Sequence, residues 1–359
     1  MRHQHGFFYW HIIIYIMCHA MGHNNAKTGR QFMARPQRVD ILQKIGRKRG
    51  SVVLSYFTGD RENVSTRIAP DVVRVIYRHL EIIGNHPRVD LILYTRGGDV
   101  LTPWRLVNLI REYTDHFSVL VPFRAYSAGT LLCLGADEIV MGKMGELGPI
   151  DPSVVNAFNP QDPSNPSARL PVSIEDVYSY MTLIAEKMGI YDESVMARAF
   201  LLLAEKIHPL ALGNVHRNWM LIRSLANKML GLRRERLTGE QVQNIVDYLT
   251  EKLYAHNHMI ARREAKEEIG LPVTFADNEL NNLMWSLYEH VAAELKLTEP
   301  FNPTEIMRGN RTEFEVASGM VESECGSDYF VFSGVVEHRD YPETGQINVN
   351  INKQGWRTL

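Results

Sequence analysis

VDLILYTRGGD, residues 89–99, joins a continuous apolar strand pattern to a turn with two glycines. The run Val89–Thr95 has the composition of a strand that is buried on both faces, as in a parallel sheet. Gly97 and Gly98 allow a sharp turn and let backbone N–H groups approach a bound oxygen without a side chain in the way. A helix is expected after the turn, near residues 101–113. The segment therefore predicts a strand–turn–helix unit.

The sequence around this unit repeats the same alternation. Strand patterns occur at residues 51–57, 118–123 and 138–141, and helical patterns at residues 70–83 and from Ser127 to Gly135. This rhythm predicts an α/β fold with a parallel sheet. Helical patterns continue over residues 173–297, and strand-like residues recur at 314–321, 328–338 and 346–352. These two regions predict a helical extension and a small C-terminal β appendage.

Three regions are expected along the chain. Residues 1–50 form an N-terminal extension, residues 51–297 the main domain, and residues 298–359 the β-rich appendage. The main domain is expected to contain a mobile loop over residues 152–171, where prolines stand among Asn, Ser and Asp. A chain of 359 residues exceeds the usual size of one hydrophobic core, which favours a main domain with appendages.

The composition excludes several classes of protein. A formal net charge of −2 gives no global attraction to nucleic acid, so no nucleic-acid partner is expected. The three cysteines lie far apart without CxxC spacing, and no phosphate-binding GxxxxGK[ST] sequence is present. We therefore expect neither a metal nor another cofactor.

The apolar stretch FFYWHIIIYIMCHAM, residues 7–21, is open to several interpretations. It contains two histidines and is shorter than the roughly 20 residues that a membrane-spanning helix needs. It could be a membrane anchor, an interfacial segment, or sequence translated from a start codon placed too far upstream, because Met33 with ARPQRVDIL reads like a natural beginning. A cytoplasmic location is expected, with membrane attachment through residues 7–21 as the alternative.

Ser127 lies in AYSAGT, residues 125–130, between a predicted strand and an apolar helix. A serine at a helix N-terminus can cap the helix with its own side chain. It can also act as a nucleophile, because first-turn amides stabilise the anion that forms when a hydroxyl attacks a carbonyl. The ends of successive parallel strands share one edge of a sheet, so Ser127 and the Gly97–Gly98 turn are expected to face a common crevice.

Several segments in fixed order resemble the serine dehydrogenase proteinase family, a branch of the superfamily of the Clp proteolytic subunit and signal peptide peptidase A. They are LILYTRGGD, AYSAGTLLCLGADEIVMG, ELGPIDP, KIHPLALGNVHR, LYAHNHMIARREAKEEIGLPV and LMWSLYEHV. The resemblance covers about residues 50–295. It implies a Clp/crotonase-like parallel β-sheet superhelix flanked by helices, and a serine peptidase that cleaves peptides or proteins through an acyl-enzyme. It also implies a homo-oligomer.

The resemblance assigns roles to residues of both turns. Ser127 would be the acylating nucleophile, and the N–H groups of Gly98 and Ala128 would form the oxyanion hole. Gly97 and Gly129 would lie next to the bound substrate, since they let its backbone come close. Removal of one oxyanion donor typically lowers the rate by about 10²–10³.

The general base stays open. The Clp subunit has a histidine where this chain has Asp151, and signal peptide peptidase A relatives use a lysine where residues 210–216 of this chain contain none. His216 is ranked first, because it stands near that place at the start of a predicted helix. Lys206 is second and His208 third. A base elsewhere, or none, is a further alternative.

Two other functions are weighed against the peptidase. A catalytically inactive Clp-like scaffold or binding protein is motivated by the unidentified base, by the β appendage and by Arg96, which stands where these families usually have proline. A crotonase-type acyl-CoA enzyme would share the superhelix and a backbone oxyanion hole, but it would not need Ser127. Normal biological complementation by Ser127→Ala would favour the scaffold, and tight binding of coenzyme A thioesters would favour the crotonase-type enzyme.

Overall fold

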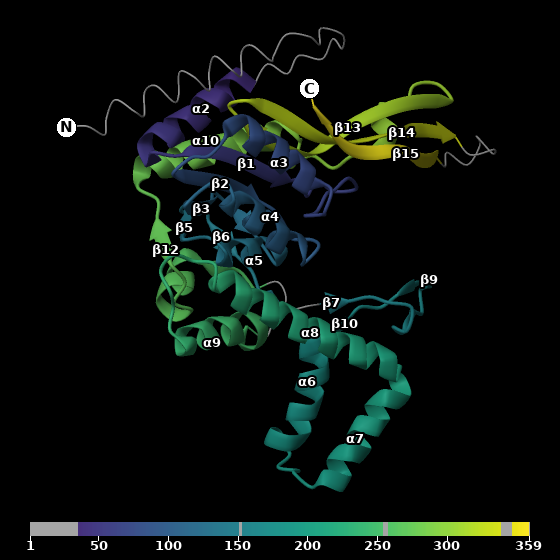
Figure 1. Ribbon diagram of the computed structural model, residues 1–359. Coiled ribbons are helices and arrows are strands. Elements are labelled where there is room, and N and C mark those ends of the chain that lie inside the picture. Colours follow the sequence, from purple (N-terminus) through teal and green to yellow (C-terminus); the bar gives the residue numbers. More distant parts are fainter. Residues whose placement is uncertain (1–34, 151–152, 254–257, 339–346, 359) are drawn as a thin grey trace.

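The computed structural model describes residues 35–150, 153–253, 258–338 and 347–358 (Figure 1). The apolar stretch 7–21 and Asp151 therefore lie outside the described residues. Within those ranges, no helix combines the length and the apolar character that crossing a bilayer requires.

One mixed sheet forms the centre of the fold. Its strand order is β12-β5-β3-β2-β1-β13-β14-β15. The strands from β12 to β1 run parallel to their neighbours, and β13, β14 and β15 continue the sheet antiparallel. The strand bounds are β1 Val52–Thr58, β2 Arg88–Tyr94, β3 His116–Val121, β5 Glu138–Met141, β12 Val273–Phe275, β13 Arg311–Ser323, β14 Gly326–His338 and β15 Ile347–Thr358. The fold is α/β as predicted, but the sheet is not wholly parallel.

Helices cover both faces of this sheet (Figure 1). One face packs against α2 (Arg35–Arg49) and α10 (Asn278–Glu294), and the other against α3 (Val72–Ile83), α4 (Thr102–Arg111) and α5 (Ala128–Leu134). Successive strand residues point to opposite faces, so Ile92 joins the first layer while Leu91 and Leu93 join the second. The apolar side chains of β2 therefore pack into the hydrophobic layers on both faces of the sheet.

Short strands connect the main sheet to the helical extension. A small sheet contains β4 (Arg124–Ala125), β6 (Glu146–Leu147) and β11 (Ile260–Ala261), in the order β11-β6-β4. Two further pairs are β7 (Ser153–Val154) with β10 (Val172–Ser173), and β8 (Gln161–Asp162) with β9 (Asn165–Arg169). The segment 152–171, predicted as a loop, thus contains several two- to five-residue strands, which are too short to leave a periodic pattern in the sequence.

The helical extension includes a hairpin that projects away from the sheet (Figure 1). The hairpin comprises α6 (Ile174–Thr182), a π-helical turn (Leu183–Lys187) and α7 (Glu193–Lys206). Large apolar side chains stand in solvent there, among them Met188 at 63%, Tyr191 at 70% and Leu201 at 61% exposure. The other helical elements are α8 Pro209–Leu230, α9 Gly239–Asp247, π-helical turns Tyr248–Lys252 and Glu264–Glu268, and α11 Pro303–Ile306.

A buried ion pair joins the two ends of the described chain. Arg38 of α2 donates from Nε to Glu322 Oε2 at 2.7 Å and from Nη2 to Glu322 Oε1 at 3.1 Å. Arg38 Nη2 also donates to the Tyr329 hydroxyl at 2.8 Å. Glu322 lies in β13, directly opposite Ser55 of β1. This contact holds α2 against the C-terminal strands. The predicted domain boundaries at residues 50 and 297 stay a prediction.

Replacement of Arg38 by methionine is expected to lower the free energy of unfolding by about 3–5 kcal/mol, because it removes both guanidinium hydrogen bonds to the buried Glu322 carboxylate and leaves it only the more distant Arg35, 3.9 Å away. Denaturant unfolding monitored by circular dichroism measures this change. The control is Lys44→Met on the same helix, which removes an exposed pair with Asp40 and should cost no more than about 0.5 kcal/mol. Equal losses in both variants would contradict the assigned role of Arg38.

Candidate active site

Ser127 stands between β4 and α5 in a strained backbone conformation. Its φ is 53° and its ψ is −112°, a region that non-glycine residues rarely adopt. The Ser127 side chain makes no capping hydrogen bond to α5. The simpler interpretation, a serine that caps the helix, is therefore not what the structure contains. Strain of this kind persists only where the surroundings hold it, and it occurs preferentially at functional sites.

Backbone hydrogen bonds fix the serine turn to the end of β2. The Tyr126 N–H donates to the Thr95 carbonyl at 3.1 Å, and the Thr95 N–H donates to the Arg124 carbonyl at 2.9 Å. On the other side, the Gly129 N–H donates to the Tyr126 carbonyl at 2.8 Å. The peptides on both sides of Ser127 are thus tied to neighbouring backbone.

The glycine turn lies directly against Ser127. Gly97 has a φ of 104°, and a Cβ added there would lie 2.8 Å from the Ser127 Cβ and 3.3 Å from its Oγ. Such a Cβ contact is too short for any side chain, so glycine is required at residue 97. Ser127 is half-buried. Its hydroxyl is therefore adjacent to the glycine turn and is not sealed in the core.

Two backbone amides next to Ser127 have no protein acceptor among the residues that the structure describes: those of Gly98 and Ala128. The Gly98 turn is held through its neighbours, since the Ile68 N–H donates to the Gly97 carbonyl at 2.9 Å and the Asp99 N–H donates to the Ile68 carbonyl at 2.8 Å. These bonds leave the Gly98 N–H unused. Chemically, free amides can donate to an oxyanion.

Gly129 allows α5 to pack closely on β2. A Cβ at this position would lie 2.4 Å from Thr95 Cγ2. Gly129 is buried, as is Ala128. Cys133 further along α5 is fully buried, and burial raises the pKa of its thiol, so the thiol stays protonated at neutral pH. The first turn of α5 is thus anchored in the core, and its predicted contact with substrate stays a prediction.

The three candidate bases all lie on exposed surface. Lys206 is the last residue of α7, and His208 caps α8 and stacks on Phe158 with ring centroids 4.9 Å apart. His216 stacks on Trp219, with centroids 5.7 Å apart. None of their recorded contacts includes Ser127. The structure thus brings the Ser127 turn and the Gly97–Gly98 turn together, as the sequence predicts. It does not bring the predicted bases into contact with Ser127.

No local sequence pattern indicates the polar network that lies beside Ser127. The Tyr126 hydroxyl donates to Glu146, and the Arg124 guanidinium lies between Glu146 and Asp60. Asp60 and Glu146 stand far from the serine in sequence, and tertiary pairing brings them close. The family-like segment ELGPIDP, which contains Glu146, was the one available signal.

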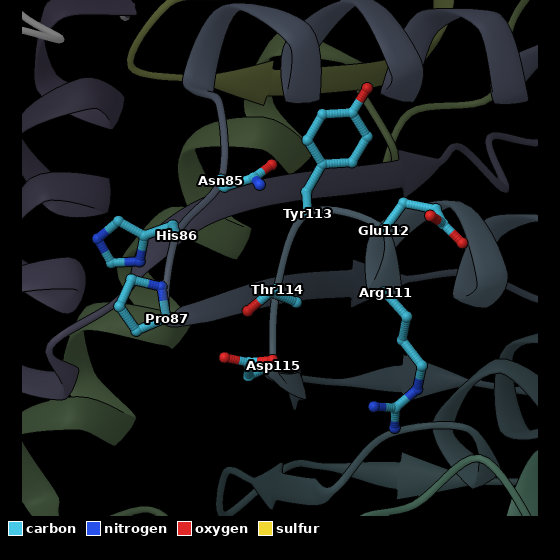
Figure 2. A pocket seen from close by; sticks show the side chains of 8 residues that line it. All are labelled: Asn85, His86, Pro87, Arg111, Glu112, Tyr113, Thr114 and Asp115. Carbon is cyan, nitrogen blue, oxygen red and sulfur yellow. The ribbon is translucent and has the colours of Figure 1, made fainter.

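A separate pocket of about 310 Å³ lies at the other edge of the parallel strands (Figure 2). Residues 85–87 and 111–115 line it, and they lead into the amino ends of β2 and β3. Ser127 and Gly97 follow the carboxyl ends of the same strands. The pocket is therefore not part of the candidate active site. Within the described ranges, no group of three or more His, Cys, Asp or Glu side chains is arranged to hold a metal ion.

Comparison with known proteins gives matches over part of the chain. A family model described as ClpP-like SDH-type serine proteinase matches residues 1–190. Uncharacterized protein MJ1495 of Methanocaldococcus jannaschii is 27% identical over 115 residues, which are 30% of this chain and 39% of that protein. Uncharacterized protein MJ0137 of the same organism is 29% identical over 110 residues, which are 29% of this chain and 38% of that protein. The chain thus spans about two fifths of the length of these curated relatives.

A solved structure is also similar in part. A serine-to-alanine mutant of the 1510-N membrane-bound stomatin-specific protease aligns with a TM-score of 0.36 and 15% sequence identity. The alignment covers 64% of this chain and 80% of that chain.

Replacement of Gly97 by alanine is expected to slow the reaction of Ser127 with a fluorophosphonate probe by about 100-fold, because the new methyl group displaces the serine. The rate of probe incorporation at fixed protein concentration measures the effect. Gly84→Ala is the control, since Gly84 also has a positive φ of 72° but has open space where a Cβ would lie. An unchanged rate in Gly97→Ala would contradict the close packing of the two turns.

Proposed function

Because the chain belongs to the family of ClpP-like SDH-type serine proteinases, we propose that it hydrolyses peptide bonds through an acyl-enzyme on Ser127. One observation carries the proposal. A half-buried serine in a strained turn packs against a diglycine turn, and two nearby amides have no protein acceptor in the described part of the chain. Acyl transfer needs this combination of an accessible hydroxyl and adjacent unpaired donors.

The proposed reaction has two halves. Ser127 Oγ attacks the substrate carbonyl carbon while a base accepts the hydroxyl proton. The N–H groups of Gly98 and Ala128 donate to the developing oxyanion, and collapse of the tetrahedral intermediate expels the amine, which takes up the proton from the protonated base. A water molecule then attacks the acyl ester by the same path and regenerates Ser127. Gly97 and Gly129 stay beside the substrate backbone in this proposal, although Ser127 fills the side-chain space at Gly97 and Thr95 fills it at Gly129.

We propose His216 as the general base, with Lys206 as the second candidate. A base must come within hydrogen-bond reach of the hydroxyl, and such contacts are often long in the absence of substrate. A lysine serves only when burial keeps its amine neutral. Lys206 is exposed, so His216 is the better supported of the two.

The substrates, the self-association and the cellular location of the protein are also proposals. The substrates are peptides or proteins, and the chain assembles with copies of itself. A cytoplasmic location stays a prediction, with attachment through residues 7–21 as the alternative. No cofactor is assigned to the reaction.

Labelling with a fluorophosphonate probe tests the nucleophile. We expect the wild type to acquire the probe on one peptide that contains Ser127, and Ser127→Ala to lose the label, because only an activated hydroxyl attacks phosphorus at a measurable rate. Mass spectrometry of the digested protein identifies the labelled residue. Ser65→Ala, at an exposed loop serine, is the control and should label like the wild type. Equal labelling of the wild type and Ser127→Ala would refute the proposal.

His216→Gln and Lys206→Met, made separately, test the base. The variant that removes the base is expected to lose about 10²–10⁴ in acylation rate, since general-base catalysis contributes that much. Stopped-flow hydrolysis of p-nitrophenyl acetate gives this rate. Wild-type rates in both variants would mean that the base lies elsewhere.

A further inference from the structure

Tyr126, the residue before Ser127, ends in a hydroxyl that donates a hydrogen bond to Glu146 Oε2. Tyr126 is half-buried, and the Glu146 side chain is 17% exposed. Neither side chain makes or breaks a bond in the proposed reaction. Their contact can still influence the reaction by restraining the serine turn beside them.

Backbone pairing brings Glu146 to this place. β4 and β6 run parallel, with Arg124 opposite Glu146 and Ala125 opposite Leu147. The Glu146 N–H donates to the Phe123 carbonyl at 2.7 Å. Glu146 therefore comes from a strand that is fixed to the segment leading into the serine turn, and it can act as a rigid acceptor.

The start of α5 is tied to the same segment by Thr130. The Thr130 hydroxyl is 2.8 Å from the Ala125 carbonyl oxygen and 2.8 Å from the Gly148 carbonyl oxygen, and it accepts from the Gly148 N–H at 3.1 Å. A Cβ at Gly148 would lie 3.1 Å from Cδ1 of Tyr126. The Tyr126 ring thus lies against the Gly148 backbone, with little room to turn away.

One guanidinium lies between two carboxylates beside the Tyr126–Glu146 pair. Arg124 Nε lies 3.7 Å from Glu146 Oε2, and Arg124 Nη1 lies 3.5 Å from Asp60 Oδ2. Asp60 in turn accepts from the Tyr94 hydroxyl at 2.8 Å. Burial, and next the hydrogen bond to Glu146, raise the pKa of Tyr126 to about 12. The Tyr126 hydroxyl therefore remains protonated, and able to donate, at neutral and mildly alkaline pH.

Given the proposed function, in which Ser127 is the nucleophile, we propose that Tyr126 and Glu146 are positioning residues. Their hydrogen bond fixes the orientation of the Tyr126 side chain and, through the shared backbone, the strained conformation of Ser127. The hydroxyl of Ser127 is thereby held against the Gly97–Gly98 turn in the geometry from which it attacks.

Tyr126→Phe tests this role, because it keeps the ring and removes only the hydroxyl. The rate constant for fluorophosphonate labelling of Ser127 is expected to fall about 10- to 100-fold. With p-nitrophenyl acetate, kcat should fall while KM stays within about twofold, since the variant alters no group that binds the ester. Thermal unfolding is measured on the same samples to verify that the variant is folded.

Tyr113→Phe is the matched control. The Tyr113 hydroxyl also donates to a carboxylate, that of Glu81, but it lies at the amino edge of the strands, remote from Ser127. This control should keep the wild-type labelling rate. Glu146→Gln retains an acceptor oxygen and should lose less rate than Glu146→Ala. A Tyr126→Phe/Glu146→Ala double variant should be no slower than the slower single variant, because both remove one interaction.

The outcomes separate this role from the proposed function. If the wild type labels at Ser127 and Tyr126→Phe labels at the same rate, the positioning role is overturned while the peptidase proposal stands. If the wild type does not label at all, both fail. If Tyr126→Phe and Tyr113→Phe lose rate and thermal stability equally, the effect is general destabilisation, and the positioning role is again overturned.

Discussion

The candidate site depends on how closely two backbone turns approach each other. The turn after β2 contains Gly97, and its missing side chain leaves just the space that the Ser127 side chain occupies. The approach is possible because Thr95 and the residues before Ser127 exchange backbone hydrogen bonds, which bring the carboxyl end of β2 next to β4. Any side chain at residue 97 would separate the turns. The position of the serine hydroxyl is thus a consequence of strand pairing, and local helix propensity has little influence on it.

This approach has an energetic cost that neighbouring bonds must offset. A non-glycine residue in a sparsely populated backbone region costs about 1–3 kcal/mol. A hydrogen bond to a charged group contributes about 1.5–3 kcal/mol. The bond from Tyr126 to Glu146 therefore has the magnitude needed to decide whether Ser127 keeps its strained conformation. The backbone bonds of Tyr126 and Gly129 fix the ends of the turn, and the hydrogen bond to Glu146 fixes the end of the Tyr126 side chain.

Local patterns predicted the central strands and the serine turn, and the family match over residues 1–190 confirms the predicted resemblance and α/β fold class. The predicted strand 138–141 agrees with β5, because an apolar run between polar residues marks its own ends. Contacts between segments that lie far apart in the sequence leave no such local pattern. The antiparallel addition of β13 to β1, and the buried contact of Arg38 with Glu322, join segments more than 250 residues apart. Glu146 could not be predicted for the same reason, because the pairing of β4 with β6 brings it next to Tyr126.

The two halves of the proposed chemistry differ in their structural support. The proposed oxyanion donors are backbone amides of one chain, and they have no protein acceptor among the described residues. The half that moves the proton has less support, because its two candidate bases, Lys206 in α7 and His216 in α8, stand in solvent. A base is efficient in a site that excludes water, because water competes for its hydrogen bonds. The hairpin of α6 and α7 also exposes Met188, Tyr191 and Leu201. Burial of these apolar side chains against a second chain would be favourable, so they support the proposed self-assembly.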